Sequence, residues 1–335
     1  MRCIFCLKER PPSQEHVFPR AIGGPLTIDR VCDQCNSELG AHVDAALCDF
    51  LPVRARRAKL GLAGNSGAVP EWYEIFLGDA TLVGEAAGRI QTTFDKATGK
   101  LSQRQLHHAA NTVLPDGQKV RQITMDAQDK DQIPKIIRRE RQRHKLRPLS
   151  DEELKAEANK YTERTVQTPV IMKSLQVSFA YVQHAVLKIV YELAFLWLGE
   201  AYLDDPLAAK LRAAVMSSDL DALDLYIGNI FDAKDCVAFS NYWTPHEGHH
   251  IAYSSVLPGK IVVSVRLFDL YATVVVVSEE PSRYFQSQAD MGKLKFLAID
   301  SVSKKMIHTE FAEERHRLAM MMTAERRKPP FADPL

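Results

Sequence analysis

The spacing of hydrophobic and polar positions changes along this chain, and each spacing predicts a different element. Near the N-terminus, Glu15–Phe18 and Thr27–Val31 have the composition of short strands, and the turn residues Gly23-Gly24-Pro25 lie between them. Apolar residues then recur at helical intervals, at Leu39, Val43, Ala46, Leu47 and Phe50. The first part of the chain is therefore expected to form two strands followed by a helix.

A glycine-rich stretch from Gly61 to Gly67 follows and is typical of a domain boundary. Beyond it, Trp72–Leu77 and Gly88–Phe94 are predicted strands in a β-rich region that extends to about residue 120. Residues 126–165 are polar, and the basic run Lys135–Arg147 is predicted to be helical because Pro134 can begin a helix.

The second half of the chain is strongly patterned. Val177–Val215 is predicted to be helical, with Asp205-Pro206 starting a second helix. The positions expected to bury the first helix and its end are Tyr181, Leu187, Val190, Tyr191, Ala194, Leu198 and Leu203. Three apolar or alternating runs then predict an antiparallel sheet, and a charged, Met-rich helix is expected around Glu310–Thr323. The sheet runs are Ile251–Val256, Lys260–Leu267 and Tyr271–Val277.

These patterns predict an α+β fold, with a small N-terminal ββα domain over residues 1–60 and a larger mixed α+β domain over residues 61–335. The larger domain would have central helices and an antiparallel sheet. With 335 residues, of which 46% are hydrophobic and 25% charged, the chain has the composition of a globular protein. Its net charge of +1 gives no overall sign of nucleic-acid binding, so such binding would need local clusters of charge.

Two further observations concern location. The opening residues lack the apolar stretch of a secretory signal, and the longest apolar run, Ala185–Leu198, is interrupted by Lys188 and Glu192. We therefore expect no membrane association and a cytoplasmic location.

Four of the six cysteines form two Cys-x-x-Cys pairs, whereas Cys48 and Cys236 stand alone. In a reducing compartment this spacing favours a metal site over disulfides. Both thiolates of each pair can reach one ion and complete a closed tetrahedral zinc site, which would stabilise a segment too small to bury a large core. The predicted zinc ligands are Cys3, Cys6, Cys32 and Cys35.

Between the cysteine pairs lie Glu15-His16 and Gly23-Gly24, and Asn36 follows the last cysteine directly. With this order of residues the segment resembles the HNH, or ββα-metal, endonuclease family, in its zinc-stapled branch that includes recombination endonuclease VII. The resemblance covers about residues 1–51. It implies that Glu15 and Asn36 hold a catalytic Mg²⁺ or Mn²⁺, that His16 is the general base, and that the four paired cysteines bind structural zinc.

The chemistry of phosphodiester hydrolysis accounts for these residue types. A neutral imidazole at His16 can take a proton from water, and the oxygens of Glu15 and Asn36 suit a hard divalent ion. Two features depart from the family: Glu15 stands where Asp is commoner, and Thr27 occupies the position of the family's middle Asn, with Asp29 as a second candidate for that supporting role. Glu38 is a further candidate metal ligand.

Two basic clusters are candidate contacts to DNA phosphates. Each also has an ordinary interpretation, as a solvated linker for the first and a solvated helix face for the second. The candidates are Arg54, Arg56, Arg57 and Lys59 in the first cluster, and Arg138, Arg139, Arg141 and Arg143 in the second.

The predicted function is a metal-dependent HNH endonuclease acting on DNA, such as a restriction or phage-defence effector, with a homodimer or a defence partner protein as its assembly. The larger domain would select substrate, sense a signal or mediate assembly. The rival hypothesis is a non-catalytic zinc-stapled module for nucleic-acid binding or assembly.

A third hypothesis, a zinc metalloprotease, comes from the segment His246-Glu247-Gly248-His249-His250, which satisfies the HExxH motif. Gly248 and the preceding Pro245 favour a loop here over the helix that a metalloprotease needs.

Overall fold

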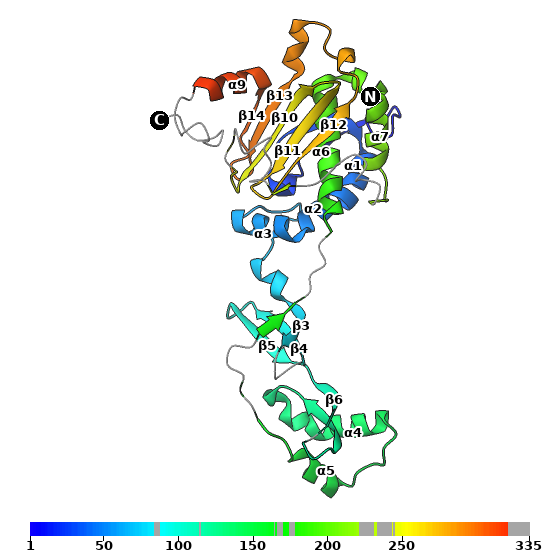
Figure 1. Ribbon diagram of the computed structural model, residues 1–335, viewed down its shortest axis with the longest axis vertical. Coiled ribbons are helices and arrows are strands. Elements are labelled where there is room, and N and C mark those ends of the chain that lie inside the picture. Colours follow the sequence, from blue (N-terminus) through cyan, green and yellow to red (C-terminus); the bar gives the residue numbers. More distant parts are fainter. Residues whose placement is uncertain are drawn as a thin grey trace. The chain divides into compact units, whose positions relative to one another are not determined.

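The computed structural model describes residues 1–83, 88–113, 115–163, 165, 170–173, 178–220, 231–232, 243 and 245–320, with residues 72, 75, 231 and 232 described by backbone alone. The chain divides into two compact units (Figure 1). Met1–Trp72 and Val177–Leu335 form the first unit, and Tyr73–Gln176 form the second. No helix within the described ranges combines the length and apolar character that a membrane span requires.

The N-terminal segment forms the predicted ββα arrangement. Strand β1 (Pro12–His16) pairs antiparallel with β2 (Thr27–Cys32), and a register shift between Ser13 and Glu15 places a bulge just before the end of β1. The helix that follows runs through α1, a π-helical turn and α2, and a further helix, α3, comes next. Their bounds are Asp33–Leu39 for α1, Gly40–Asp44 for the π-helical turn η2, Ala45–Asp49 for α2 and Leu51–Leu60 for α3.

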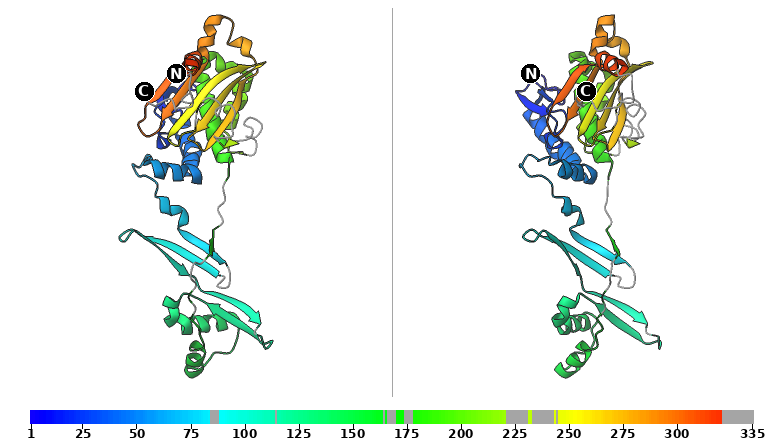
Figure 2. Two further views of the ribbon diagram at one scale, coloured as in Figure 1. Left: turned by 60° about the vertical axis from the view of Figure 1, so that its left-hand side comes forward. Right: turned by 90° about the vertical axis from the view of Figure 1, so that its left-hand side faces the viewer.

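The rest of the first unit is a six-stranded antiparallel sheet, in the order β14-β13-β10-β11-β12-β9, with helices against it. Helix α6 packs against β11 and β12 and also against η2 and α2 (Figure 2). The elements are α6 (Ala180–Leu198), η5 (Glu200–Asp204), α7 (Pro206–Val215), β9 (Phe231–Asp232), β10 (His249–Leu257), β11 (Lys260–Leu267), β12 (Tyr271–Ser278), η7 (Pro281–Arg283), η8 (Gln288–Lys293), β13 (Lys295–Asp300), β14 (Met306–Glu310) and α9 (Phe311–Met320).

One hydrophobic core joins the N-terminal segment to these elements. Buried residues from Cys3 to Leu62 belong to the same cluster as α6, α7 and the inner face of the sheet. The Gly-Gly turn takes part in this packing, because a Cβ on Gly23, whose φ is +87°, would lie 2.2 Å from the carbonyl oxygen of Ser301. The first unit therefore extends across the predicted boundary near residue 60, since the ββα segment buries its apolar side chains against α6 rather than in a core of its own.

The second unit contains a four-stranded sheet in the order β5-β4-β3-β8, a separate β6-β7 hairpin and short helices. Its elements are η3 (Trp72–Phe76), β3 (Gly78–Val83), β4 (Gly88–Asp95), β5 (Lys100–Gln105), β6 (His108–Val113), β7 (Lys119–Thr124), η4 (Ala127–Gln132), α4 (Ile133–Arg143), α5 (Asp151–Ala158) and β8 (Val170–Met172). The strand predicted at Trp72–Leu77 is wrong: this segment is the 3-10 helix η3, and Tyr73 stacks on Phe94 of β4 instead of pairing as a strand.

The α+β fold class is confirmed, as are the antiparallel strands β10, β11 and β12 and the helices α4, α6 and α7. Asp205 caps α7 as predicted, since its carboxylate accepts hydrogen bonds from the backbone N–H groups of Leu207 and Ala208. Tyr181, predicted to be buried, is instead 43% exposed. The predicted C-terminal helix corresponds to α9 as far as Met320, and Cys236 lies outside the described residues.

Candidate functional site

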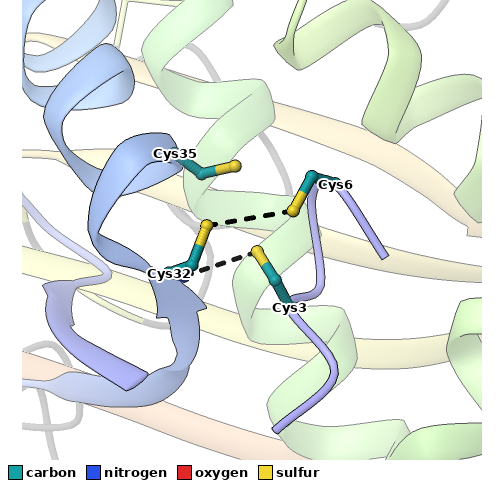
Figure 3. A group of neighbouring side chains, drawn as sticks. All are labelled: Cys3, Cys6, Cys32 and Cys35. Atoms are coloured by element: carbon teal, nitrogen blue, oxygen red, sulfur yellow. Dashed lines mark hydrogen bonds between the residues drawn. The ribbon is translucent and has the colours of Figure 1, made fainter. Parts of the chain in front are cut away.

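The four paired cysteines converge on one point in the first unit (Figure 3). Cys3 and Cys6 come from the N-terminal turn, Cys32 ends β2 and Cys35 lies in α1. Their sulfur atoms all lie within 4.8 Å of one another. A turn closed by Leu7, at a φ of +57°, folds the first pair back toward the second, and the Leu7 N–H donates to the Cys3 carbonyl oxygen at 2.9 Å. The cysteines are thus positioned to bind a metal ion.

The surroundings of the four sulfurs suit a thiolate-bound ion. Cys3, Cys32 and Cys35 are buried, so solvent has little access to the cluster. Burial acts to raise the pKa of Cys32, but hydrogen bonds from the Cys35 backbone and the neighbouring thiols outweigh it and lower that pKa to about 7. Burial raises the pKa of Cys3 and Cys35, whose deprotonation a bound cation would favour. An all-sulfur donor set of this kind is typical of structural zinc.

A second group of polar side chains lies where β1 ends beside the helix. Glu15, His16 and Asn36 line one pocket of about 470 Å³, together with Asp44 of η2. Asn36 also fixes the bulge in β1, since its Nδ2 donates to the Ser13 hydroxyl at 2.7 Å and to the Gln14 carbonyl oxygen at 2.9 Å. These two bonds orient the amide and leave its Oδ1 as the atom with ligand capacity.

Glu15 and Asp44 share a buried lysine. The Lys188 ammonium lies in ion-pair contact with Glu15, 3.0 Å from each carboxylate oxygen of Asp44, and 3.1 Å from the backbone carbonyl oxygen of His16. Glu15 is 2% exposed and Lys188 is 0% exposed. Burial raises the pKa of Glu15 and of Asp44, and the Lys188 charge opposes that rise at both carboxyls.

His16 has the electrostatic setting of a neutral imidazole. Its side chain is half-buried at the pocket, and burial lowers its pKa, as do the nearby charges of Arg20 and Lys188. An imidazole with a lowered pKa is unprotonated near neutral pH and is able to accept a proton from water. The residues around the pocket therefore supply oxygen ligands suited to a divalent ion and a nitrogen base beside them.

Neither Asp44 nor Lys188 is predicted to be a site residue from the sequence. Asp44 lies on the helix that begins near Asn36, and only the fold shows that both face one pocket. Lys188 carried a signal, because it interrupts the longest apolar run of the chain together with Glu192. Glu192 is also fully buried, and neither of its carboxyl oxygens has a hydrogen-bond partner. Burial raises its pKa well above the ordinary value.

The three supporting candidates do not line the pocket. Thr27 lies opposite His16 in the β1–β2 ladder, where it supports the strand that carries the histidine. Asp29 is exposed, and so is Glu38, which accepts a hydrogen bond from the Gln34 side chain at 3.0 Å. Their placement favours Thr27 as a backbone support and gives Asp29 and Glu38 no contact with the pocket.

The first basic cluster is engaged largely within the protein. Arg56 pairs with Asp269, and Lys59 pairs with Glu247. Arg57 is 5% exposed, and its Nε and Nη1 donate to the carbonyl oxygens of Ala21 and Cys48 at 2.8 Å and 3.2 Å. Arg57 is therefore not part of a solvated, phosphate-binding run. It is a buried arginine that links α3 to α2 at Cys48 and to Ala21, and it also lines the pocket.

The second cluster, on α4, also makes contacts inside its own unit. Arg138 pairs with Asp151, Arg143 pairs with Glu140, and Arg141 donates to the Arg147 carbonyl oxygen. Arg139 is exposed. This pattern favours the solvated, internally paired helix face over a dedicated phosphate-binding surface.

The HExxH string does not form a metal site. His249 and His250 begin strand β10, so the string lacks the helix on which two histidines would share one face. The His246 ring stacks on His249, with centroids 3.9 Å apart, and both nitrogens of His250 have hydrogen-bond partners in Ile22 and Phe268. The predicted loop or hairpin interpretation agrees with this geometry.

Comparison with known proteins identifies the class of the site. Residues 3–51 match the model of the HNH endonuclease family, and this segment contains both the four-cysteine cluster and the residues Glu15, His16 and Asn36. The N-terminal segment is thus similar to HNH endonuclease domains, and its four paired cysteines are positioned to bind a metal ion. No curated protein and no solved structure matches the chain.

Proposed function

We propose that this protein is a metal-dependent endonuclease that hydrolyses phosphodiester bonds of DNA at the pocket formed by Glu15, His16 and Asn36. The observation that carries the proposal is that these three side chains line one pocket in the segment that matches the HNH family. A nucleic acid is the substrate class that this family implies. The choice of DNA rests on the resemblance to the recombination endonuclease branch.

In this proposal His16 is the general base. Its imidazole accepts a proton from the attacking water, and the Asn36 amide keeps the end of β1 in place through Ser13 and Gln14. Glu15 and Asn36 would hold Mg²⁺ or Mn²⁺, and Asp44 is a further oxygen ligand at the same pocket. Such an ion supplies neutralisation of phosphate charge and acidification of bound water. Hydrolysis of this kind leaves 5′-phosphate and 3′-hydroxyl ends.

Zinc at Cys3, Cys6, Cys32 and Cys35 would have a structural role. The four sulfurs leave no open position for a substrate, which is the arrangement of structural zinc sites. The cysteines join the N-terminal turn to the end of β2 and the start of α1. They therefore hold in register the strand and the helix that carry His16 and Asn36.

Arg20 and Arg57 are the basic residues that line the pocket, and we assign the phosphate contacts to them. Arg57 is held by two backbone carbonyl oxygens through Nε and Nη1, so its guanidinium has a fixed orientation. A guanidinium fixed in this way loses little side-chain entropy when it binds a phosphate. Arg54, Arg56, Lys59 and the cluster on α4 remain candidates for outer contacts to the nucleic-acid backbone.

The non-catalytic alternative explains the pocket poorly. A binding module has no need for a half-buried imidazole next to two carboxylates, and burying those carboxylates costs free energy. A role in restriction or phage defence, assembly as a homodimer or with a defence partner, and substrate selection or sensing by residues 61–335 complete the proposal.

The test is a set of cleavage assays on purified, zinc-loaded protein. Supercoiled plasmid, linear duplex DNA, single-stranded DNA and RNA are incubated with Mg²⁺ or Mn²⁺, and the product ends are mapped by ligation and by 3′-extension. The proposal predicts DNA cleavage with 5′-phosphate and 3′-hydroxyl ends. Cleavage of RNA alone would transfer the activity to another substrate, and binding without cleavage of any of these substrates would favour the non-catalytic alternative.

A further inference from the structure

Lys188 reaches the HNH site from outside the segment that defines it. Helix α6 begins at Ala180, far from the matched residues 3–51, and packs against η2 and α2 within the first unit. Lys188 is the residue through which α6 contacts the polar side chains of the site. Its ammonium contacts the side chains of Glu15 and Asp44 and the backbone of His16.

The contacts of Lys188 use the whole capacity of an ammonium group. Lysine has three N–H donors, and the acceptors around its nitrogen are the two carboxylate oxygens of Asp44 and the carbonyl oxygen of His16. Glu15 lies in ion-pair contact, and the buried Glu192 of α6 adds a further negative charge. Lys188 contacts Oε1 of Glu15, and Glu15 also lines the pocket. Lys188 thereby sets the rotation of the Glu15 carboxylate and the position of the peptide at His16.

A purely structural role accounts for this lysine less well. Buried ion pairs are often no more stabilising than apolar side chains of similar volume, because both charges lose hydration. Apart from Lys188, Glu192 and His184, the buried positions of α6 are apolar or aromatic, so an apolar residue at 188 would suit the helix. The charge lies instead among three carboxyl groups, those of Glu192 on the same helix and of Glu15 and Asp44, the two that line the pocket.

We propose that Lys188 is a positioning residue of the nuclease site, acting through Glu15, Asp44 and the His16 carbonyl, so that the HNH domain is completed by α6. The proposal rests on the proposed function. Groups that hydrogen-bond to metal ligands orient them, and losing such a group typically costs roughly 10- to 100-fold in metal affinity or activity. Lys188→Met keeps an unbranched side chain one atom shorter than lysine and removes the charge.

The experiment measures Mn²⁺ binding to the full-length, zinc-loaded chain without substrate, by electron paramagnetic resonance, alongside single-turnover cleavage of plasmid. Lys188→Met is expected to weaken Mn²⁺ binding by roughly 10- to 100-fold. Lys188→Arg, which keeps the charge but places its donors differently, should fall between Lys188→Met and wild type. The matched control is Tyr191→Phe, which removes another contact from α6 to the N-terminal segment, the 2.7 Å bond from the Tyr191 hydroxyl to the Ile4 carbonyl oxygen, and should bind Mn²⁺ as wild type does.

Each outcome decides the proposal. Wild-type or tighter Mn²⁺ binding by folded Lys188→Met would overturn it, and tighter binding would make Lys188 a competitor of the ion. Should Lys188→Met fail to fold, Lys188→Arg decides: weakened binding supports the proposal, and wild-type binding overturns it. A wild-type chain that neither binds Mn²⁺ nor cleaves DNA would refute the proposed function itself, whereas active wild type with equally active Lys188 variants would refute only the role of Lys188.

Discussion

His250 is predicted to make the stability of the first unit depend on pH. The Phe268 N–H donates to Nδ1 of His250 at 3.3 Å, so Nε2 carries the proton and donates to the Ile22 carbonyl oxygen at 2.9 Å. This is the neutral imidazole. The side chain is 0% exposed and stacks on Phe18, and it joins β10 to the turn that follows the candidate base.

The size of this effect on the free energy of unfolding follows from the pKa of His250. Burial lowers the pKa of His250 to about 4, against about 6.5 in an unfolded chain. This difference corresponds to about 3 kcal/mol in the free energy of unfolding. As pH falls, the unfolded chain binds the proton first. The contribution is therefore complete above about pH 6.5 and is lost progressively as pH falls toward 4.

The assay is urea unfolding at pH 7.5 and pH 4.5, followed by tryptophan fluorescence, which reports mainly the first unit because Trp197 and Trp243 are buried in it. The control is His250→Gln, which keeps a donor and an acceptor but does not titrate. Between the two pH values wild type should lose about 2.5 kcal/mol more than the variant. An equal loss in both proteins would refute the assignment of a neutral, buried His250.

Two further predictions concern the frame of the site. Cys35→Ser should reduce the zinc content of the purified chain from one ion to near none and lower the stability of the first unit, as measured by mass spectrometry of metals and by urea unfolding; full zinc content in the variant would contradict the four-sulfur site. Arg57→Met should destabilise the first unit by about 1–3 kcal/mol, because the carbonyl oxygens of Ala21 and Cys48 lose their donors. It should also raise the KM for plasmid DNA, and an unchanged KM would remove Arg57 from the phosphate contacts.

The residues of the candidate site that the structure brings together are those whose spacing in the sequence is local. The short spacing within each Cys-x-x-Cys pair predicts that its two sulfurs lie close together. In the structure all four sulfurs lie within 4.8 Å of one another. Glu15 and His16 lie between the two cysteine pairs and Asn36 follows the second pair, and the structure places these three side chains around one pocket. The observed strand β1 is Pro12–His16, nearer the N-terminus than the predicted Glu15–Phe18, and it contains a bulge between Ser13 and Glu15.

Long-range packing accounts for what could not be predicted. Lys188 lies far along the chain from Glu15, and nothing local to either residue signals their contact. The division into units was not predictable from local patterns either. Residues 73–176 form a separate compact unit, and the segments before and after it share one core. The partners of Arg56 and Lys59 are Asp269 and Glu247, so two of the four cations in a run that resembles a phosphate-binding surface are paired with acids within the fold.

The most direct test of the account is single-turnover cleavage of supercoiled plasmid by wild type and by His16→Ala, both zinc-loaded and supplied with Mg²⁺ or Mn²⁺. Loss of the general base should slow cleavage by about 10²- to 10⁴-fold, with zinc content and stability unchanged. Added imidazole should restore part of the rate, since the pocket of about 470 Å³ has room for it beside the missing side chain. Cleavage by His16→Ala at the wild-type rate would contradict the assignment of the catalytic site.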